Sequence, residues 1–362
     1  MPYTFMMDDV NNRDVAELVN ANDLAKLLGA PLFHSIGVRV LNIARTARLP
    51  VLLHADAYAG YDLAELSDTH GISIWVGTPP ILSGVATAGP KVKARRVVSG
   101  AEPLHPPVRK TLEDKTGASV DDGYGSTEAA PVIWLNGRLA PSVKGMVVDP
   151  DLLDDVRSGK AHLSTLKPLP MGTPGIFLIA PKDPKRSSLM DGYMNREEHE
   201  QPFVLVRGDK WLITGDMVVH GKKDKETGKV VDDLHYIQGR LDDEFKVAGE
   251  KVGLGKVSED LNGLPELQAQ GTEQPGQVFN LEGIRLENRD PIFVMFTVRK
   301  GMTVDEANKL LRKANTHAKA SVHYVVVLDE FPLGGTGKVD RKSLRNKLKD
   351  PEFRKSVGMD IP

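Results

Sequence analysis

A glycine-rich segment, Gly123-Tyr124-Gly125-Ser126-Thr127-Glu128, contains residue types that suit a bound phosphate group and its metal ion. Its glycines let the backbone approach a ligand closely, and the tyrosine ring offers a face for stacking. The hydroxyl of Thr127 can reach a phosphate, and Glu128 supplies the hard carboxylate oxygens that Mg²⁺ prefers. Taken alone, the segment fits better as a glycine-rich turn that ends in a surface glutamate. The rest of the chain must decide between the two interpretations.

Two other segments each carry one charged group that could act on a ligand. Trp211-Leu212-Ile213-Thr214-Gly215-Asp216 ends in a carboxylate, which can accept hydrogen bonds from two adjacent donors, although a plain Thr-Gly-Asp turn is the alternative. In Gly334-Gly335-Thr336-Gly337-Lys338, a flexible lysine can neutralise charge that builds on phosphorus, although a surface loop is the alternative. Val339 stands where a phosphate-binding P-loop needs Ser or Thr, so that motif is excluded.

Taken in order from Pro31 to Arg341, these segments resemble the motifs of the adenylate-forming family, which includes acyl-CoA synthetases, adenylation domains and luciferases. Three further segments share the resemblance. Pro31-Leu32-Phe33-His34 is similar to the segment that faces the acyl pocket, and Ser99-Gly100-Ala101-Glu102-Pro103-Leu104 is similar to the adenine-lining turn. Gly239-Arg240-Leu241-Asp242-Asp243 is similar to the hinge before the small domain.

The resemblance implies a role for each matching residue. The catalytic residues would be Thr127, Glu128 and Lys338, with Glu128 as the ligand of Mg²⁺ and Lys338 between the substrate carboxylate and the α-phosphate. Asp242 would be the pivot about which the small domain swings. His34 and Thr78 would line the pocket for the acid. The residues that line the site for the nucleotide and the coenzyme would be Gly100, Ala101, Glu102, Tyr124, Gly125, Asp216, Arg240, Gly249 and Lys251.

The sequence departs from the family at its phosphate-binding loop. In the family, a Ser/Thr/Gly-rich loop ending in Pro-Lys-Gly precedes the acyl-pocket segment, and nothing between Met1 and Ala30 resembles it. Gly29 is the only glycine there, whereas a cradle of backbone amides needs several residues that adopt positive φ. We therefore expect the back two-thirds of a family member, N-terminally truncated, with impaired adenylation when it acts alone.

Two smaller departures from the family pattern concern the coenzyme side of the expected ligand cleft. Where the family often has an arginine, Lys251 keeps the charge but loses the bidentate fork. The usual apolar helix–strand pattern between Leu261 and Pro291 is replaced by a Gln/Glu/Gly-rich stretch, Gln268 to Gln277, which is typical of a loop.

The elements that must position these residues begin with an α/β pattern from about Leu32 to Glu128. Apolar runs of strand length alternate with amphipathic segments, which predicts a doubly wound, mostly parallel sheet. The expected strands are 51–55, 72–77, 96–100 and 118–122, and the expected helices are 62–66, 81–88 and 106–115. In such a sheet the ligand lies beyond the carboxyl ends of the strands, where 78–80, 100–102 and 123–128 fall.

A β-rich part and a small α+β domain are expected to follow. The β-rich part has expected strands at 175–179, 211–219 and 234–239 and a long hairpin loop at 221–233. The small domain has an expected helix at 304–317, a strand at 322–328 and a basic helix after Arg341. The expected organisation is a partial large domain at 1–240, with an α/β layer at about 1–130 and a β-rich part at about 131–240, and a small domain at 241–362 with the lysine loop.

The composition indicates a globular protein that binds small ligands. The 362 residues are 40% hydrophobic and 27% charged, which is enough for two globular domains. With 47 basic and 49 acidic residues, the net charge of −2 favours small ligands over nucleic acid or an anionic membrane. The sequence contains no cysteine, which excludes disulfides, thiolate-bound zinc and cysteine nucleophiles. No secretory signal or membrane-spanning run is visible, so we expect a cytoplasmic protein.

The expected function is ATP-dependent activation of a carboxylic acid as an acyl-adenylate, followed by formation of a thioester. The expected cofactors are ATP, Mg²⁺ and coenzyme A, or the phosphopantetheine of a carrier protein in its place. The alternative is a non-catalytic protein that binds AMP or an acyl-adenylate, or a fragment that needs a partner. A partner protein or a second copy of the chain would cover the open strand edge of a truncated sheet.

Overall fold

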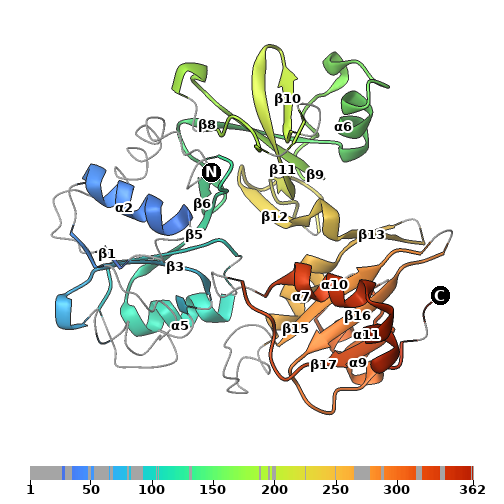
Figure 1. Ribbon diagram of the computed structural model, residues 1–362. Coiled ribbons are helices and arrows are strands. Elements are labelled where there is room, and N and C mark those ends of the chain that lie inside the picture. The colour runs from blue at the N-terminus through green and yellow to red at the C-terminus, as the bar shows by residue number, and fades with distance from the viewer. Residues whose placement is uncertain are drawn as a thin grey trace. The chain divides into compact units, whose positions relative to one another are not determined.

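The computed structural model divides the chain into two compact units (Figure 1). The first unit comprises Met1–Leu104 and Thr111–Gln238, and the second comprises His105–Lys110 and Gly239–Pro362. The residues that the structure describes are 27–28, 35–47, 50–52, 65, 68–79, 81–82, 93–102, 104, 106–129, 133–186, 189–194, 196–197, 201–224, 226–248, 250–264, 278–286, 289–314, 320–334, 339–359 and 361. None of the helices in these ranges combines the length and the apolar character needed to cross a bilayer.

A mostly parallel sheet forms one layer of the first unit. Within the described residues its seven strands run in the order β2-β1-β3-β4-β5-β6-β7. β1 to β5 pair in parallel, whereas β6 and β7 pair antiparallel. The strands are β1 (Leu27–Leu28), β2 (Val51–Leu52), β3 (Ile74–Gly77), β4 (Arg96–Gly100), β5 (Ser119–Tyr124), β6 (Trp134–Leu135) and β7 (Arg138–Leu139).

Helices pack on both faces of this sheet. α2 (Ser35–Ala47) lies on one face, and α5 (Pro106–Thr116), from Thr111 onward, lies on the other (Figure 1). Ala44 of α2 and Leu112 of α5 are fully buried, as expected for helices that each turn an apolar stripe toward the strands. The predicted fold class, an α/β doubly wound and mostly parallel sheet, is confirmed.

Most predicted strands of this layer are present with slightly different ends. The strand predicted at 72–77 begins two residues later, as β3, and the one predicted at 118–122 continues to Tyr124, as β5. The strand predicted at 51–55 is described only as β2, because 53–55 lie outside the described residues. Most of the helices predicted at 62–66 and 81–88 also lies outside them. The short strand β1 was not predicted.

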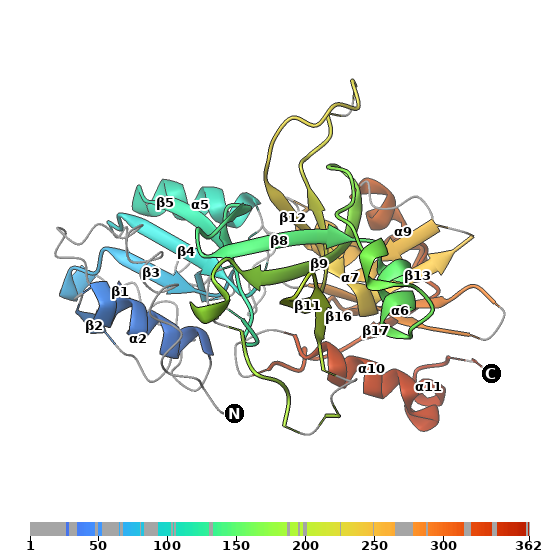
Figure 2. The same ribbon diagram turned by 90° about the horizontal axis from the view of Figure 1, so that it is seen from above.

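An antiparallel sheet forms the β-rich part. Its strands run in the order β10-β11-β9-β8, and β12 pairs with β11. The connection between β11 and β12 projects as an arm, closed by a bridge between Lys223 and Val230, which confirms the predicted hairpin loop (Figure 2). The elements are β8 (Val143–Val148), α6 (Pro150–Arg157), β9 (Pro174–Pro181), β10 (Phe203–Val206), β11 (Asp209–His220) and β12 (His235–Arg240), with 3₁₀ turns at Leu163–Thr165 and Pro184–Arg186.

The second unit is an α+β layer with helices on both faces of a small sheet. Within the described residues its strands run in the order β15-β16-β17, with β15 antiparallel and β17 parallel to β16. A separate hairpin, β13 with β14, precedes it. The elements are a 3₁₀ turn at Leu241–Asp243, β13 (Glu244–Val247), β14 (Glu250–Gly253), α7 (Leu254–Asn262), β15 (Phe279–Ile284), β16 (Ile292–Thr297), α9 (Val304–Lys313), β17 (Tyr324–Val327), α10 (Arg341–Lys349) and α11 (Pro351–Ser356).

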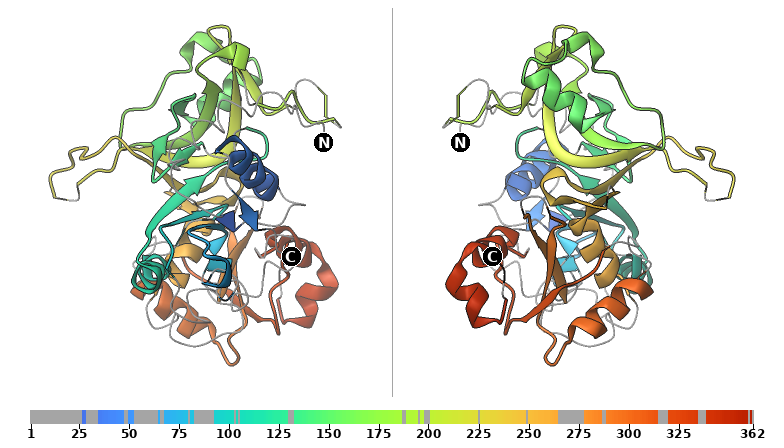
Figure 3. Two further views of the ribbon diagram at one scale, coloured as in Figure 1. Left: turned by 90° about the vertical axis from the view of Figure 1, so that its left-hand side faces the viewer. Right: turned by 90° about the vertical axis from the view of Figure 1, so that its right-hand side faces the viewer.

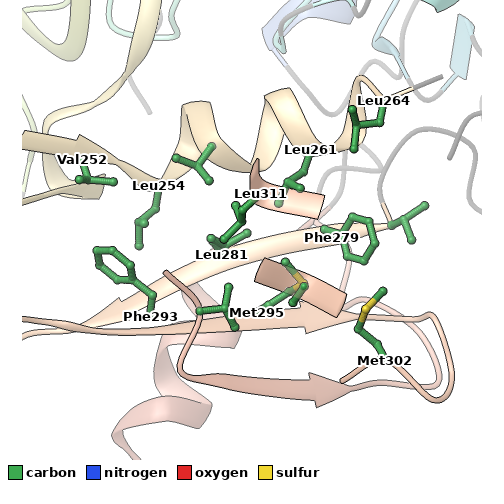
Figure 4. Packing of buried hydrophobic residues seen from close by; sticks show 14 of the residues in the cluster. Val252, Leu254, Leu261, Leu264, Phe279, Leu281, Phe293, Met295, Met302 and Leu311 are labelled. Atoms are coloured by element: carbon green, nitrogen blue, oxygen red, sulfur yellow. The ribbon is translucent and has the colours of Figure 1, made fainter. Parts of the chain in front are cut away.

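The side chains of β16 point alternately to the two faces of this sheet, which explains how both faces are covered. Phe293 and Met295 point to one face and pack with Leu261 of α7 and Leu311 of α9 (Figure 4). The intervening residues of β16 point the other way and pack against α10, which lies on the opposite side of the sheet from α9 (Figure 3). A strand buried on both faces is apolar along most of its length, and β16 is apolar from Ile292 to Phe296, before the buried Thr297 at its end.

One expectation for the second unit is wrong. The helix–strand pattern between Leu261 and Pro291 is not wholly replaced, because β15 lies there and pairs with β16 along its whole length. Its buried polar residues, Asn280 and Glu282, interrupt the apolar pattern by which a strand is recognised in a sequence. The stretch 268–277 itself lies outside the described residues.

Four charged side chains form a buried network in the second unit. Asp243 and Glu282 have side chains only 3% and 2% exposed. Arg341 and Arg345, one turn apart on α10, each bridge both carboxylates: their Nε atoms lie 2.6 Å and 2.8 Å from the Glu282 oxygens, and their terminal nitrogens contact Asp243. The network therefore ties the 3₁₀ turn at Leu241–Asp243 to β15 and to the start of α10.

Replacing Arg341 with Met is expected to lower the free energy of unfolding by about 3–5 kcal/mol, because it leaves two buried carboxylates with a single arginine, Arg345, to compensate their charge. Chemical denaturation monitored by circular dichroism measures the change. Lys349→Met, at an exposed position on the same helix, is the control and should change stability by less than about 0.5 kcal/mol. Equal effects of the two substitutions would contradict a stabilising role for the network.

A pair of stacked histidines joins β11 to β12. The rings of His220 and His235 lie 4.3 Å apart and 6° from parallel, and His220 Nε2 is 2.6 Å from an oxygen of Asp233. His235 is buried, and its Nδ1 lies 3.2 Å from the carbonyl oxygen of Gly137. Burial, followed by the charge of His220, lowers the pKa of His235, although Gly137 and Asp233 oppose this.

We expect stability to fall as the pH drops below about 6.5, the ordinary pKa of histidine. The unfolded chain then takes up a proton that the buried ring resists, so the contribution of His235 is complete above that pH and is lost below it. His235→Phe keeps a ring in place and should flatten the dependence of unfolding free energy on pH between 7 and 5, measured by urea titration. His162→Phe, at an exposed position, should leave the dependence unchanged, and a flattening by both or by neither would refute the assignment.

Candidate nucleotide-binding site

The carboxyl ends of three neighbouring parallel strands gather the candidate residues of the first unit at one edge of the sheet. β3, β4 and β5 end at Gly77, Gly100 and Tyr124, and the register keeps these ends level, since Gly77 pairs with Ser99 and Gly100 with Gly123. This is the edge at which open α/β sheets bind ligands. The candidate residues at or directly after the strand ends are Thr78, Gly100, Ala101, Glu102, Tyr124, Gly125, Thr127 and Glu128.

Three buried hydroxyl groups at this edge have no hydrogen-bond partner among the described residues. They belong to Thr78, Ser99 and Ser126, and come from or directly after three adjacent strands. Thr78 is 1% exposed and Ser99 is fully buried. Because a buried polar atom without a partner is costly, such atoms are expected where a ligand or ordered water completes the site.

The turn after β4 has a strained backbone. Ala101 has φ of 74°, in the left-handed region that favours glycine. For a residue with a Cβ this costs about 1–3 kcal/mol, and such strain occurs preferentially where a protein binds a ligand. The turn containing Gly100, Ala101 and Glu102, predicted to line adenine, thus has the geometry of a constrained binding loop.

A hydrogen bond between Tyr124 and Asp216 links the two sheets of the first unit. The Tyr124 hydroxyl donates to Asp216 Oδ2 over 2.5 Å, and both residues are 9% exposed. Tyr124 ends β5 of the parallel sheet, whereas Asp216 lies on β11 of the antiparallel sheet. The two most distinctive motifs of the sequence, separated by 92 positions, are therefore in direct contact.

A β-bulge in β11 places the Asp216 side chain. The pairing of β11 with β9 shifts between Ile213 and Met217, and Gly215 has φ of 74°, which a residue with a Cβ rarely adopts. Thr214 Oγ1 donates to the carbonyl of Phe177 over 2.8 Å and accepts from the Asp216 amide over 3.1 Å. The Thr-Gly-Asp sequence thus forms an irregular strand segment that re-aims the carboxylate.

The ring of Tyr124 is part of an aromatic cluster. It stacks on Trp134 with ring centroids 4.2 Å apart, and Phe177 lies against Trp134 at 5.3 Å. We predicted that Tyr124 offers a stacking face to a base; in the structure Trp134 covers one face of the ring. Trp134, which sequence reasoning did not single out, therefore fixes the ring whose hydroxyl contacts Asp216.

Glu128 contacts a tyrosine from a distant part of the chain. The hydroxyl of Tyr193 donates to Glu128 Oε1 over 2.8 Å, and the Met190 amide donates to the Glu128 carbonyl oxygen over 2.8 Å. Sequence reasoning did not identify Tyr193, and its only local signal is a Gly-Tyr pair in a polar stretch.

The residues near Glu128 fit a magnesium ion that is completed by a ligand. In the described part of the chain, no group of three His, Cys, Asp or Glu side chains is arranged to hold a metal by itself. Mg²⁺ is commonly held through one or two carboxylates together with substrate phosphates and water. A single partly exposed carboxylate beside the Thr127 hydroxyl suits that mode of binding.

Three predicted residues lie in the second unit. Arg240 ends β12 and Asp242 lies in the following 3₁₀ turn, directly after the point at which the chain passes between units. Lys251 lies on β14, with its ammonium nitrogen 3.9 Å from Glu244 Oε2. The remaining predicted residues, His34, Gly249 and Lys338, lie outside the described residues.

Known proteins with similar sequences are longer than this chain. The chain is 24% identical over 339 residues to 4-coumarate–CoA ligase 5 of Oryza sativa subsp. japonica, an alignment that covers 88% of this chain and 56% of that protein. The chain thus spans about half the length of the curated relatives it matches.

Solved structures share the fold. O-succinylbenzoate coenzyme A synthetase from Bacillus subtilis, in complex with ATP and magnesium ion, superimposes with a TM-score of 0.72 at 20% identity, over 96% of this chain and 66% of that one. ATP-bound MatB from Rhodopseudomonas palustris gives a TM-score of 0.70 at 22% identity, over 95% of this chain and 64% of that one. At these identities the likeness concerns the fold.

A sequence model of the family described as AMP-binding enzyme matches residues 4–193. The matched residues include the strand ends at Gly77, Gly100 and Tyr124, and they make up more than half of the 362 residues. This match shows that the chain belongs to the AMP-binding enzyme family.

Proposed function

We propose that this protein activates a carboxylic acid with ATP, forming an acyl-adenylate and pyrophosphate, and then transfers the acyl group to a thiol. The observation that carries the proposal is the buried contact of Tyr124 with Asp216. It brings together two motifs whose residue types suit the adenylate's phosphate and ribose, at the edge of the sheet where unpartnered hydroxyls lie.

Each group of the first unit has a distinct task in this reaction. Asp216 accepts hydrogen bonds from the ribose hydroxyls, because a carboxylate offers two acceptors to two adjacent donors. Thr127 donates to a phosphate oxygen. Glu128 would hold Mg²⁺, which when bound neutralises phosphate charge during attack by the acid. Thr78 and His34 would line the acid pocket.

The second unit would supply the remaining chemistry. We assign it as the small domain, with Asp242 as the hinge and Lys338 as the cation that neutralises the α-phosphate. Arg240 would contact the ribose, while Gly249 and Lys251 would serve the coenzyme side. The first unit is then the large nucleotide-binding domain. The acyl acceptor is coenzyme A or the phosphopantetheine of a carrier protein, and a partner protein or a second copy of the chain would pair with the sheet edge at β2.

Binding of AMP tests the nucleotide site without catalysis. Asp216→Ala is expected to weaken AMP binding about 10- to 100-fold, since hydrogen bonds to a charged group contribute about 1.5–3 kcal/mol. Isothermal titration calorimetry measures the affinity. Asp209→Ala, on the same strand but paired with Lys144, is the matched control and should retain the wild-type affinity. If Asp216→Ala bound AMP as tightly as the wild type, the ribose assignment would fail.

Pyrophosphate release with a panel of aryl and alkyl acids tests the catalytic assignment. Lys338→Ala is expected to lower the rate about 100- to 1,000-fold, because it removes charge stabilisation that acts in the transition state. Lys342→Ala, at an exposed position in the next helix, is the control and should release pyrophosphate at the wild-type rate.

The same assay separates the two candidate functions. Release that survives Lys338→Ala unchanged would remove the assignment of Lys338. Binding of AMP by the wild type with no release for any acid would instead favour a non-catalytic protein that binds AMP or an acyl-adenylate.

A further inference from the structure

Tyr193 reaches Glu128 from the connection between β9 and β10, two strands of the other sheet of the first unit. The segment precedes β10, whereas Glu128 follows β5 of the parallel sheet. Two bonds of 2.8 Å join them: the Tyr193 hydroxyl donates to Glu128 Oε1, and the Met190 amide donates to the Glu128 carbonyl oxygen. The contact thus fixes both the backbone and the side chain of Glu128.

Gln201 holds the backbone of Tyr193 on both sides. Its Oε1 accepts from the Tyr193 amide over 2.6 Å, and its Nε2 donates to the Tyr193 carbonyl over 2.9 Å. The same Nε2 donates to the Arg196 carbonyl over 2.8 Å. A Cβ on Gly192 would lie 2.8 Å from Gln201 Oε1, so a larger residue before the tyrosine would displace the end of the Gln201 side chain.

Further contacts fix the ring and the ends of the segment. The guanidinium carbon of Arg196 lies 4.5 Å from the centre of the Tyr193 ring, which is a cation–π distance. Lys210 of β11 donates to the Asp191 carbonyl over 2.9 Å, and Leu189 is buried in the same apolar cluster as Ala129, the residue after Glu128. The phenol is therefore held in place independently of Glu128.

The geometry gives the two oxygens of Glu128 different surroundings. Oε1 accepts from the phenol, while no described residue donates to Oε2. A partly exposed glutamate otherwise samples several rotamers, and ordering it costs free energy each time a cation binds. Carboxylates that bind metals are commonly oriented by a hydrogen bond from a neighbouring side chain, and loss of that neighbour typically lowers metal affinity 10- to 100-fold.

We propose that Tyr193 is a positioning residue for Glu128: its hydroxyl holds the carboxylate by Oε1 and leaves Oε2 directed to the magnesium ion of a bound Mg·ATP. This inference rests on the proposed function, because it assumes that Glu128 faces that metal. Tyr193 itself acts through Glu128 and not through the nucleotide.

The experiment measures ATP affinity by calorimetry in saturating Mg²⁺ and again in EDTA. The ratio of the two affinities is the enhancement due to the metal. Tyr193→Phe removes only the hydroxyl and is expected to lower the enhancement about tenfold, toward the value for Glu128→Gln, while affinity in EDTA stays within about twofold. In the Glu128→Gln background, adding Tyr193→Phe should change nothing further.

Two other variants separate positioning from folding. Tyr236→Phe removes another phenol–carboxylate bond of 2.8 Å, to Asp232, and should leave the enhancement at the wild-type value. Gln201→Met keeps the Tyr193 hydroxyl but loosens its clamp, and should lower the enhancement in the same direction. It serves as the test if Tyr193→Phe melts at a lower temperature than the wild type.

The outcomes distinguish this inference from the function on which it rests. A wild-type protein that binds no ATP overturns both. A wild type with metal-enhanced binding that Tyr193→Phe retains overturns the role of Tyr193 alone. Equal losses in Mg²⁺ and EDTA, or a further loss in the Glu128→Gln background, would show a structural role and also overturn it.

Discussion

The hydrogen bond between the Tyr124 hydroxyl and the Asp216 carboxylate is the contact on which the candidate site depends. It joins the end of a parallel strand to the middle of an antiparallel one, with both groups buried. A buried carboxylate must be hydrogen-bonded to offset its lost hydration, so Tyr124 both stabilises Asp216 and restricts its orientation. The two sheets of the first unit are thereby held in one arrangement at the point where their motifs meet.

The other features of the first unit support this contact. Trp134 packs on the Tyr124 ring, and the bulge at Gly215 turns Asp216 out of the regular pairing of β11. On the opposite flank of the same turn, the segment around Tyr193 crosses from the antiparallel sheet to Glu128. Two phenol–carboxylate bonds therefore bracket the glycine-rich turn after β5. The hydroxyls that have no partner among the described residues and the strained Ala101 lie along the same sheet edge, which is the arrangement expected of a site whose polar groups bind a ligand.

Sequence periodicity predicts the layers of this protein better than it predicts the contacts between its side chains. The parallel strands β3 and β4 each contain a short apolar run and end in glycine, and the projecting hairpin arm follows a polar run between strands, so both could be predicted. β15 could not, because its buried Asn280 and Glu282 break the apolar pattern, and only the folded chain shows that Glu282 pairs with Arg341. The same holds for the site. The motif residues at Tyr124, Glu128 and Asp216 stand out by type and spacing, whereas Tyr193 becomes recognisable only when a segment 65 positions away folds onto Glu128.

A crystal structure of the protein with AMP and magnesium would test the central claim most directly. We expect the ribose hydroxyls to lie within hydrogen-bond distance of the Asp216 carboxylate while Tyr124 keeps its bond to that residue. We also expect the phosphate to lie beside the turn containing Thr127 and Glu128. Nucleotide density elsewhere, with Asp216 contacting only protein groups, would contradict the assignment of this site.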